Sequence, residues 1–355
     1  MKLVKFENEK RYVRDFINLP KKLYDSSENM ENPNTVKKIL LGTHPLSKYF
    51  KLDKFLVFDD NGKAVGRFCI TTYEGDNTAY MGFFECINDN EIAKFLFDKM
   101  FVFCKERNYE KVQGPVDASF WIKYRLKINN FETPYTGEPY NKDYYFVFFK
   151  ENGFDVKEHY TSNVFRAIDE TYVNEVFEKR FDEFVSKGYE IRSLKNGEFS
   201  KAIDDVYRLL IVLYKDFPIF KEIEIESFRE LFNSYEQIID NDMTKFAYFN
   251  GEMVGFYISI PDYGNLVYHT DNLFNIFKIL RRKKKPKRFV MLYIGVDLQH
   301  RGLGKALVYA IMKELKINGL PSISALIRDG RVNQKYALKD VTDVYEYVLL
   351  ERRLR

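Results

Sequence analysis

The stretch "IGVDLQHRGLGKALVYAIMKELK", Ile294–Lys316, decides the fold of this chain. Its apolar beginning predicts a strand that ends at Val296, and its second half has the apolar spacing of an amphipathic helix. Gly302 and Gly304 lie between the two. Glycines at the start of a helix let an anion approach the backbone, where free N–H groups and the helix dipole bind it. The stretch therefore predicts a strand, a loop that can hold a phosphate, and a helix.

Two other phosphate-binding patterns are excluded in this stretch. The pattern GxxxxGK followed by Ser or Thr is absent, and GxGxxG fails because Leu307 stands at its last glycine position. Arg301 and Lys305 add positive charge beside the glycines. A glycine-containing loop without a ligand is the alternative interpretation.

The loop resembles that of the GNAT superfamily of acyl-CoA N-acyltransferases. The family motif, Gln/Arg-x-x-Gly-x-Gly/Ala after a strand that ends in Val, fits Arg301–Ala306, and a second register fits Gln299–Gly304. The resemblance implies that loop amides hold the CoA pyrophosphate and that the end of the strand pairs with pantetheine. The cofactor-binding residues that it implies for acetyl-CoA, or another acyl-CoA, are Ile294, Val296, Arg301, Gly302, Leu303, Gly304, Lys305, Ala306 and Asn333.

The chain departs from the family pattern at two positions. Leu298 replaces a common Pro, and Asp340 stands where the family usually has a Tyr. The family's general acid therefore cannot be carried over to this sequence.

A repeated hairpin indicates a duplication. "NGKAVG" at 61–66 and "NGEMVG" at 250–255 each lie between strand-like runs, where Asn-Gly favours a tight turn. The order of neighbouring elements also repeats: a strand at 78–86 and a helix at 90–107, then a strand at 289–296 and a helix at 303–317. We expect an α/β (α+β) fold of two GNAT-like units, each a mixed, mostly antiparallel twisted sheet flanked by helices. The alternative is a chance coincidence of two Asn-Gly turns.

The predicted domain boundaries follow from this repeat. Residues 1–168 form the first unit, 169–188 a connecting helix, and 189–355 the acyl-CoA-binding unit. The first copy lacks the glycine loop, because Asp89 and Glu91 stand where it would be. Carboxylates there repel a pyrophosphate and cap the helix instead. We therefore expect a degenerate first unit.

Composition and charge set limits on the function. A chain of 355 residues fits two domains, and 45% apolar with 30% charged residues is ordinary for a globular protein. The net charge of +4 does not favour nucleic acid as a partner. Three cysteines give neither a disulfide framework nor a metal-binding spacing. Without a signal peptide or a spanning segment, we expect a cytoplasmic protein with no membrane partner and no metal.

Acyl transfer from a thioester to an amine needs a base for the amine and an acid for the leaving thiolate. Tyr336, three residues after Asn333, is the candidate acid, with Tyr293 as a second choice. Asp262, at the end of the second hairpin, is the candidate base, against the alternative of a turn-forming Asp. We expect His300 to face solvent.

The segment 114–145 of the first unit is unusually aromatic for a loop. It either lines an acceptor pocket in a cleft between the units or closes the core of the first unit. The candidate substrate-binding residues in it are Trp121, Tyr124, Arg125 and Glu138.

The run "KILRRKKKPKR", 278–288, is strongly basic. It could attract CoA phosphates, RNA or ribosomes, but a solvated loop is the favoured interpretation.

The function expected is acyl transfer, most simply acetyl transfer, from acyl-CoA to a primary amine of a small molecule or peptide. A non-catalytic module that binds acyl-CoA or a metabolite is the alternative, and a basic-loop adaptor for RNA or ribosomes is a third.

Overall fold

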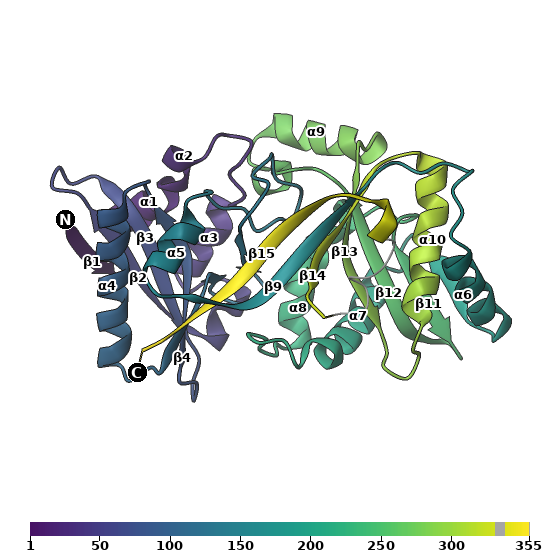
Figure 1. Ribbon diagram of the computed structural model, residues 1–355, viewed down its shortest axis with the longest axis horizontal. Helices are drawn as coiled ribbons and strands as arrows, with labels where there is room; N and C mark the ends of the chain where they lie inside the picture. The colour runs from purple at the N-terminus through teal and green to yellow at the C-terminus, as the bar shows by residue number, and fades with distance from the viewer. Residues whose placement is uncertain (331–337, 355) are drawn as a thin grey trace. The chain divides into compact units, whose positions relative to one another are not determined.

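The computed structural model describes residues 1–330 and 338–354, which divide into two compact units (Figure 1). Unit 1 comprises Met1–Pro134, Glu138–Tyr160 and Tyr345–Arg355, and unit 2 comprises Tyr135–Gly137 and Thr161–Val344. This division differs from the boundaries expected from the sequence. The helix expected as a connector belongs to unit 2, and the end of the last strand belongs to unit 1. A repeat in the sequence does not reveal that the end of the last strand belongs to unit 1. That assignment depends on which distant strand the last strand pairs with.

The sheet of unit 1 is antiparallel from β1 to β4, and β5 then runs parallel to β4. The C-terminal part of β15 (Val341–Arg353) pairs antiparallel with β5 through Leu350 and Gly114. The strands before β15 are β1 (Lys2–Phe6), β2 (Lys51–Phe58), β3 (Ala64–Thr72), β4 (Thr78–Cys86), β5 (Lys111–Gly114), and the short β6 (Val116–Asp117), β7 (Lys123–Tyr124) and β8 (Leu126–Lys127).

Helices cover both faces of this sheet, and every residue of β3 and β4 is buried. One apolar cluster includes Leu96 and Phe97 of α4 and Phe149 of α5, and the other includes Phe16 of α1 and Ile39 of α3. The helices of unit 1 are α1 (Lys10–Asn18), α2 (Pro20–Leu23), α3 (Pro33–Leu40), the 3-10 helix η1 (Pro45–Tyr49), α4 (Asn90–Glu106) and α5 (Tyr145–Glu151). β9 (Asp155–Phe165) begins in unit 1 and ends in unit 2.

Unit 2 repeats this sheet, with β10 to β13 antiparallel and β14 parallel to β13. Its strands are β10 (Glu190–Ser193), β11 (Lys245–Phe249), β12 (Glu252–Pro261), β13 (Phe289–Val296) and β14 (Ser322–Arg328). Its helices are α6 (Glu175–Ser186), α7 (Phe199–Tyr214), α8 (Ile225–Phe232), α9 (Leu273–Lys284) and α10 (Leu303–Asn318), with 3-10 helices η2 (Asn233–Gln237), η3 (Leu266–Tyr268) and η5 (Leu338–Asp340).

The core of unit 2 lies between the sheet and α10. Leu303, Leu307 and Ile311 of α10 are buried against β12 and β13, and Phe184 of α6 joins the same cluster. Helix α6 therefore packs as part of the unit (Figure 1), where the sequence predicted a connector.

The predicted fold class is confirmed, and strands 78–86 and 289–296 have the expected bounds. The two Asn-Gly turns nevertheless differ. In unit 2 Asn250 and Gly251 both have positive φ, 51° and 82°, and they alone join β11 to β12. In unit 1 the turn is longer, Gly62 has a φ of 73°, and Asp59 closes the loop by accepting a hydrogen bond from the Lys63 N–H. The Asn-Gly dipeptide thus occurs at equivalent positions of the two units but forms loops of different length.

Candidate functional site

The start of α10 is open to an anion. After β13, the Asp297 carboxylate accepts from the Gln299 N–H at 2.9 Å, which folds the chain back toward the helix. Gly302 is the N-cap with a φ of 93°, a left-handed conformation that glycine adopts without strain. No side chain caps the helix there, and Arg301 is exposed. The Leu303 and Lys305 N–H groups donate to the carbonyls of His300 and Gly302 at 3.2 Å. Among the described residues, the Gly304 N–H and the positive dipole end of α10 are what this helix start offers to a ligand.

The equivalent helix of unit 1 is closed by its own side chain. Asp89 is the N-cap of α4, and its Oδ1 accepts from the N–H groups of Glu91 and Ile92 at 2.9 and 3.1 Å. A carboxylate already lies where a phosphate would bind. Within the described residues, the prediction that Asp89 caps this helix is confirmed.

The central strand of each unit separates from its parallel neighbour. β13 pairs with β14 only from Phe289 to Met291, and β4 pairs with β5 only from Thr78 to Tyr80. Beyond Met291, no strand among the described residues pairs with the edge of β13 that faces β14. A ligand with amide groups can add to such an edge as a further strand.

A bulge follows the separation in both units. In β13, Tyr293 pairs with Ile258 and Met291 with Ser259, so Leu292 is an extra residue. In β4 the register shifts opposite Arg67 and Cys69, and Phe83 has a φ of 49°. A bulge removes backbone groups from the ladder, and bulges are common beside active sites. The backbone of β13 can thus present an N–H to a ligand.

A largely apolar cavity of ≈ 70 Å³ lies beside β13 in unit 2. Its lining comes from β12, β13 and β14, from the inner face of α10, from η5, and from the end of β9 with the segment after it. Representative lining residues are Met291, Ile294, Val308, Ile311, Ile327 and Phe165. This space can receive an apolar chain that enters along the free part of β13.

On the α1 side of its sheet, unit 1 holds a cluster of buried charges. Arg67 is fully buried, forms an ion pair with Glu31, and has one guanidinium nitrogen 3.7 Å from Glu85. Tyr145 donates to Glu85 at 2.6 Å. Burial raises the pKa of the Glu85 carboxyl, and Arg67 opposes this shift. This polar network contacts α1, whereas the cavity of unit 2 borders α10. On the matching α4 side of unit 1, Phe84, Phe97 and Phe149 pack in one apolar cluster.

The predicted cofactor-binding residues gather at one end of β13 and the start of α10. Arg301 is exposed, Gly302 caps the helix, and Ile294 lines the cavity. The side chains of Leu303 and Ala306 are fully buried in the core, so only their backbone can meet a ligand. Val296 pairs with Gly255, and Gly304 and Lys305 are half-buried in the first turn of α10. Asn333 lies outside the described residues.

Of the two predicted catalytic residues, Tyr336 lies outside the described residues. Asp262 is held by a structural network. Its Oδ1 accepts from Thr136 and Gly264 N–H groups at 3.0 and 2.8 Å, and its Oδ2 pairs with Arg288 at 2.5 Å. This arrangement favours the alternative of a turn-organising aspartate, because both carboxylate oxygens already have partners.

His300 is half-buried and does not face solvent as the sequence predicted. Its Nδ1 lies 2.6 Å from the Tyr189 hydroxyl, and its ring packs edge-on against Tyr189 and Phe249. The contact links the loop before α10 to β11.

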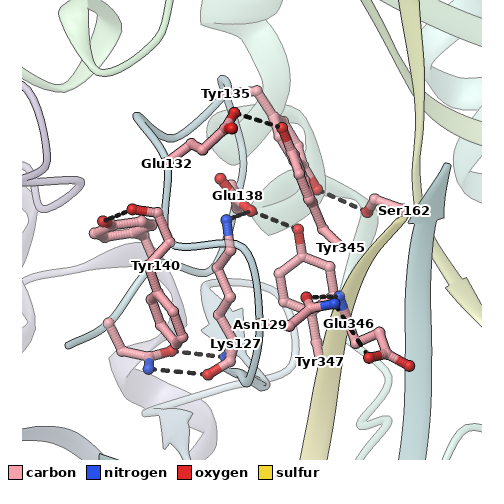
Figure 2. A network of polar contacts seen from close by, with 12 residues as sticks. Lys127, Asn129, Glu132, Tyr135, Glu138, Tyr140, Ser162, Tyr345, Glu346 and Tyr347 are labelled. Atoms are coloured by element: carbon pink, nitrogen blue, oxygen red, sulfur yellow. Dashed lines mark hydrogen bonds and ion pairs between the residues drawn. The ribbon is translucent and has the colours of Figure 1, made fainter. Parts of the chain in front are cut away.

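All four predicted substrate-binding residues lie in unit 1. Tyr124 is buried, and the Arg125 guanidinium stacks 3.8 Å from its ring centre; Trp121 is half-buried. Glu138 is buried and pairs with Lys127 at 2.6 Å (Figure 2). Tyr347 also donates to Glu138 at 2.5 Å. Glu138 therefore stabilises the core of unit 1, and its role in substrate binding stays a prediction, like that of the other three.

Two tyrosines meet on β13 and η2. Tyr293 follows the bulge, and Tyr235 is hydrogen-bonded to it. Burial raises the pKa of Tyr235, and Tyr293 raises it further. Sequence reasoning identified Tyr293 from its place on the motif strand but missed Tyr235, which no motif marks.

Two features are absent from the described residues. No group of three or more His, Cys, Asp or Glu side chains is placed to hold a metal. None of the helices in residues 1–330 and 338–354 has the length and apolar character to cross a membrane.

Each unit contributes a set of mixed strands with a splayed and bulged central strand followed by a helix, and the chain shares its overall fold with a solved tandem GNAT protein. A tandem GNAT protein from the clavulanic acid biosynthesis pathway aligns over 100% of this chain and 98% of its own, with a TM-score of 0.52 and 12% identity. A probable N-acyltransferase from Enterococcus faecalis V583 aligns over 99% of this chain and 72% of its own, with a TM-score of 0.54 and 9% identity.

A third solved structure contains a GCN5-related glucosamine N-acetyltransferase region of a fungal multi-domain β-N-acetylglucosaminidase. It has a TM-score of 0.53 and 14% identity over 99% of this chain, which spans only 38% of that protein. No family model matches the sequence, and no curated protein matches it. At these identities the likeness establishes the fold alone.

Proposed function

We propose that unit 2 binds an acyl-CoA and transfers its acyl group to a primary amine of a small molecule or peptide. The observation that carries the proposal is the open N-terminus of α10 at Gly302, directly after a central strand that is splayed and bulged. The fold shared with tandem GNAT proteins supports the same reading.

The CoA pyrophosphate would bind at the first turn of α10. Backbone N–H groups there have no side-chain cap, and the helix dipole favours a negative charge. Arg301 and Lys305 would add charge-assisted contacts at the same point. Asp297 and His300 shape the loop through the bonds described above, which fixes the direction of the amides before the ligand arrives.

The pantetheine arm would lie along the free part of β13. Its amides can pair with the strand backbone beyond Met291, where β14 no longer does. The apolar cavity lined by Ile294, Val308 and Ile311 would take the thioester end or the acyl group. We propose acetyl-CoA as the donor, with a longer acyl chain as the alternative that this cavity leaves open.

The reaction requires positioning more than covalent chemistry by the protein. The amine nitrogen attacks the thioester carbonyl, the C–S bond breaks, and the nitrogen loses a proton while the thiolate gains one. An N–H freed by the bulge at Leu292 would stabilise the carbonyl oxygen. We propose Tyr336 as the acid. Asp262 is not retained as the base because of its bonds to Arg288 and Thr136, and a water molecule is proposed to take the amine proton.

Unit 1 is proposed to bind no acyl-CoA. Asp89 fills the anion position of α4, and Phe84, Phe97 and Phe149 pack on the α4 side of the sheet. Trp121, Tyr124 and Arg125 remain proposed contacts for the acceptor.

One observation favours the non-catalytic alternative, in which the chain binds acyl-CoA or a metabolite without transfer. Among the described residues of unit 2, both Asp262 and His300 are engaged in structural contacts. Release of free thiol from acetyl-CoA, measured with a panel of amines, amino acids and aminoglycosides, separates the two functions. Acyl transfer predicts amine-dependent thiol release, and a binding protein predicts a ligand-induced rise in Tm without it.

A further inference from the structure

Helix α9 is an addition to the fold of unit 2. It lies in the connection between β12 and β13, residues 262–288, whereas the matching connection in unit 1, between β3 and β4, is residues 73–77. The short connection closes the same pair of strands, so the sheet does not require α9. The helix is nevertheless well formed, because the Asn272 side chain caps it by accepting from the Phe274 N–H at 2.9 Å.

The apolar residues of α9 point away from the protein. Leu273, Phe274 and Phe277 are 77%, 77% and 78% exposed, and Leu280 is 54% exposed. Only Ile279 is buried in the unit. Leu273, Phe277 and Leu280 recur at the spacing that places residues on one side of a helix. A surface helix normally turns this stripe toward the core, so an outward stripe indicates a binding surface.

Positive charge adjoins the stripe. Residues 272–288 contain no Asp or Glu, and the last turn of α9 holds Arg281, Arg282, Lys283 and Lys284. Arg282 and Lys283 donate to backbone carbonyls of Asp262 and Gln237. For Lys284, Lys285 and Lys287 the structure records no ion pair within the residues it describes, and Arg281 likewise has none. The basic run expected as a loop is thus helical as far as Lys284, with uncompensated charge at its end.

We propose that α9 lies on the surface of an anionic membrane, with its apolar stripe in the boundary between headgroups and acyl chains and its cations on lipid phosphates. An amphipathic helix with aromatic and aliphatic residues on one face and Lys or Arg beside them is suited to this position. Each cation near an anionic surface adds attraction, and long Lys and Arg stems reach headgroups while their carbons stay in apolar surroundings.

Single-stranded RNA is the less favourable occupant. RNA binding uses cations with aromatic rings on which bases stack, and it gives no reason for exposing Leu273 and Leu280. The expectation that the protein has no membrane partner was based on the absence of a spanning segment. A helix that lies in the plane of the interface needs no such segment, so the proposal revises that expectation.

Cosedimentation of the full chain with vesicles tests the proposal. Phosphatidylcholine vesicles that contain phosphatidylglycerol should bind the protein, and pure phosphatidylcholine vesicles should bind it far less. Added salt should weaken the binding. Removing Lys284 and Lys285 in Lys284→Ser/Lys285→Ser should weaken it about fivefold for each cation. Phe274→Ser/Phe277→Ser should weaken it about tenfold or more.

The matched control is Ile317→Ser, which removes an 81% exposed apolar side chain at the end of α10 and should leave vesicle binding unchanged. A second readout distinguishes insertion from adsorption. In the Phe277→Trp variant, the added indole emission should shift to the blue on anionic vesicles, because the ring leaves water. Since all these side chains are exposed, the variants should keep the Tm of the parent protein.

Four results would overturn the proposal: no binding to anionic vesicles, unchanged binding by Phe274→Ser/Phe277→Ser, no emission shift for Phe277→Trp, or a loss of binding by Ile317→Ser. If the phenylalanine variant instead dissolved a dimer, or weakened binding to single-stranded RNA without affecting vesicles, the surface would belong to that other partner. None of these outcomes depends on acyl-CoA binding, so the proposed function is tested separately.

Discussion

Asp89 and Gly302 hold the same place in the two units, one residue before the helix that follows the central strand, and only Asp89 closes its helix with a side chain. The Asp89 Oδ1 accepts from two backbone N–H groups of α4, whereas Gly302 has no side chain and offers α10 only its carbonyl oxygen, which accepts from the Lys305 N–H at 3.2 Å. The two units thus differ at this point: a side chain caps the helix of unit 1, and none caps the helix of unit 2.

Removing the Asp89 carboxylate should destabilise unit 1. In Asp89→Ala, two N–H groups of α4 lose their acceptor, which costs about 1 kcal/mol of unfolding free energy. Urea unfolding measures this loss. Asp89→Asn is the control, because an Asn side chain caps nearly as well. Equal stability of Asp89→Ala and the parent protein would show that the cap contributes nothing.

The Lys127–Glu138 pair should be a stability determinant of unit 1. Both side chains are almost completely buried at 2.6 Å, so Glu138→Gln leaves an uncompensated ammonium and should cost about 3–5 kcal/mol. The control is Lys94→Met, which removes an exposed pair with Asp98 and should cost less than about 1 kcal/mol. If Glu138→Gln kept its stability and changed only the KM for an amine acceptor, Glu138 would be the substrate ligand that the sequence suggested.

His44 should make stability depend on pH. Burial, and to a smaller extent Lys38, lowers the pKa of His44 to about 4 from a usual value of 6.5. Between these values the unfolded chain binds the proton and the folded chain does not, so the contribution of His44 is present above pH 6.5 and is lost as the pH falls toward 4. Urea midpoints measured across this range should fall less steeply for His44→Gln. If the urea midpoints of the parent protein and of His44→Gln fell equally with pH, His44 would not be a cause of the pH dependence.

Tyr336→Phe tests the proposed acid. Loss of a general acid should lower kcat about 100-fold or more, while the KM for the acyl-CoA stays unchanged because binding does not use the hydroxyl. Steady-state thiol release gives both constants. Tyr293→Phe is the comparison, since Tyr293 is the second tyrosine candidate. An unchanged kcat for Tyr336→Phe would remove Tyr336 from the mechanism.

Local patterns made much of the fold predictable. Strand 289–296, its glycine loop and the helix after it follow from apolar periodicity and from Gly302, all within one short stretch. Helix α3 was missed although Asn32 and Pro33 form a start signal and Val36, Ile39 and Leu40 have helical spacing, because eight residues are too few for a clear periodic pattern. The basic end of α9 was expected as a loop because it lies just before the motif strand, but Lys and Arg are good helix formers.

Contacts between segments that are distant in the sequence could not be predicted from local patterns. The partnership of Asp262 with Arg288 and Thr136 depends on how distant segments meet, and nothing in a turn-like "IPDYGN" reveals it. The assignment of residues 345–355 to unit 1 likewise depends on the pairing of β15 with β5. The exposed stripe of α9 could be read as amphipathic from sequence, but its direction is known only from the structure.

The central claim is that CoA binds at Gly302. Isothermal titration with CoA should compare the parent protein with Gly302→Glu and Gly319→Glu, which place the same side chain at opposite ends of α10. Both glycines have positive φ, 93° and 60°, so both variants carry backbone strain, and the Tm of each variant shows whether it still folds. We predict binding by the parent protein and by Gly319→Glu, and none by Gly302→Glu, whose carboxylate would repel the pyrophosphate. No binding by the parent protein at millimolar CoA, or equal binding by all three proteins, would contradict the account.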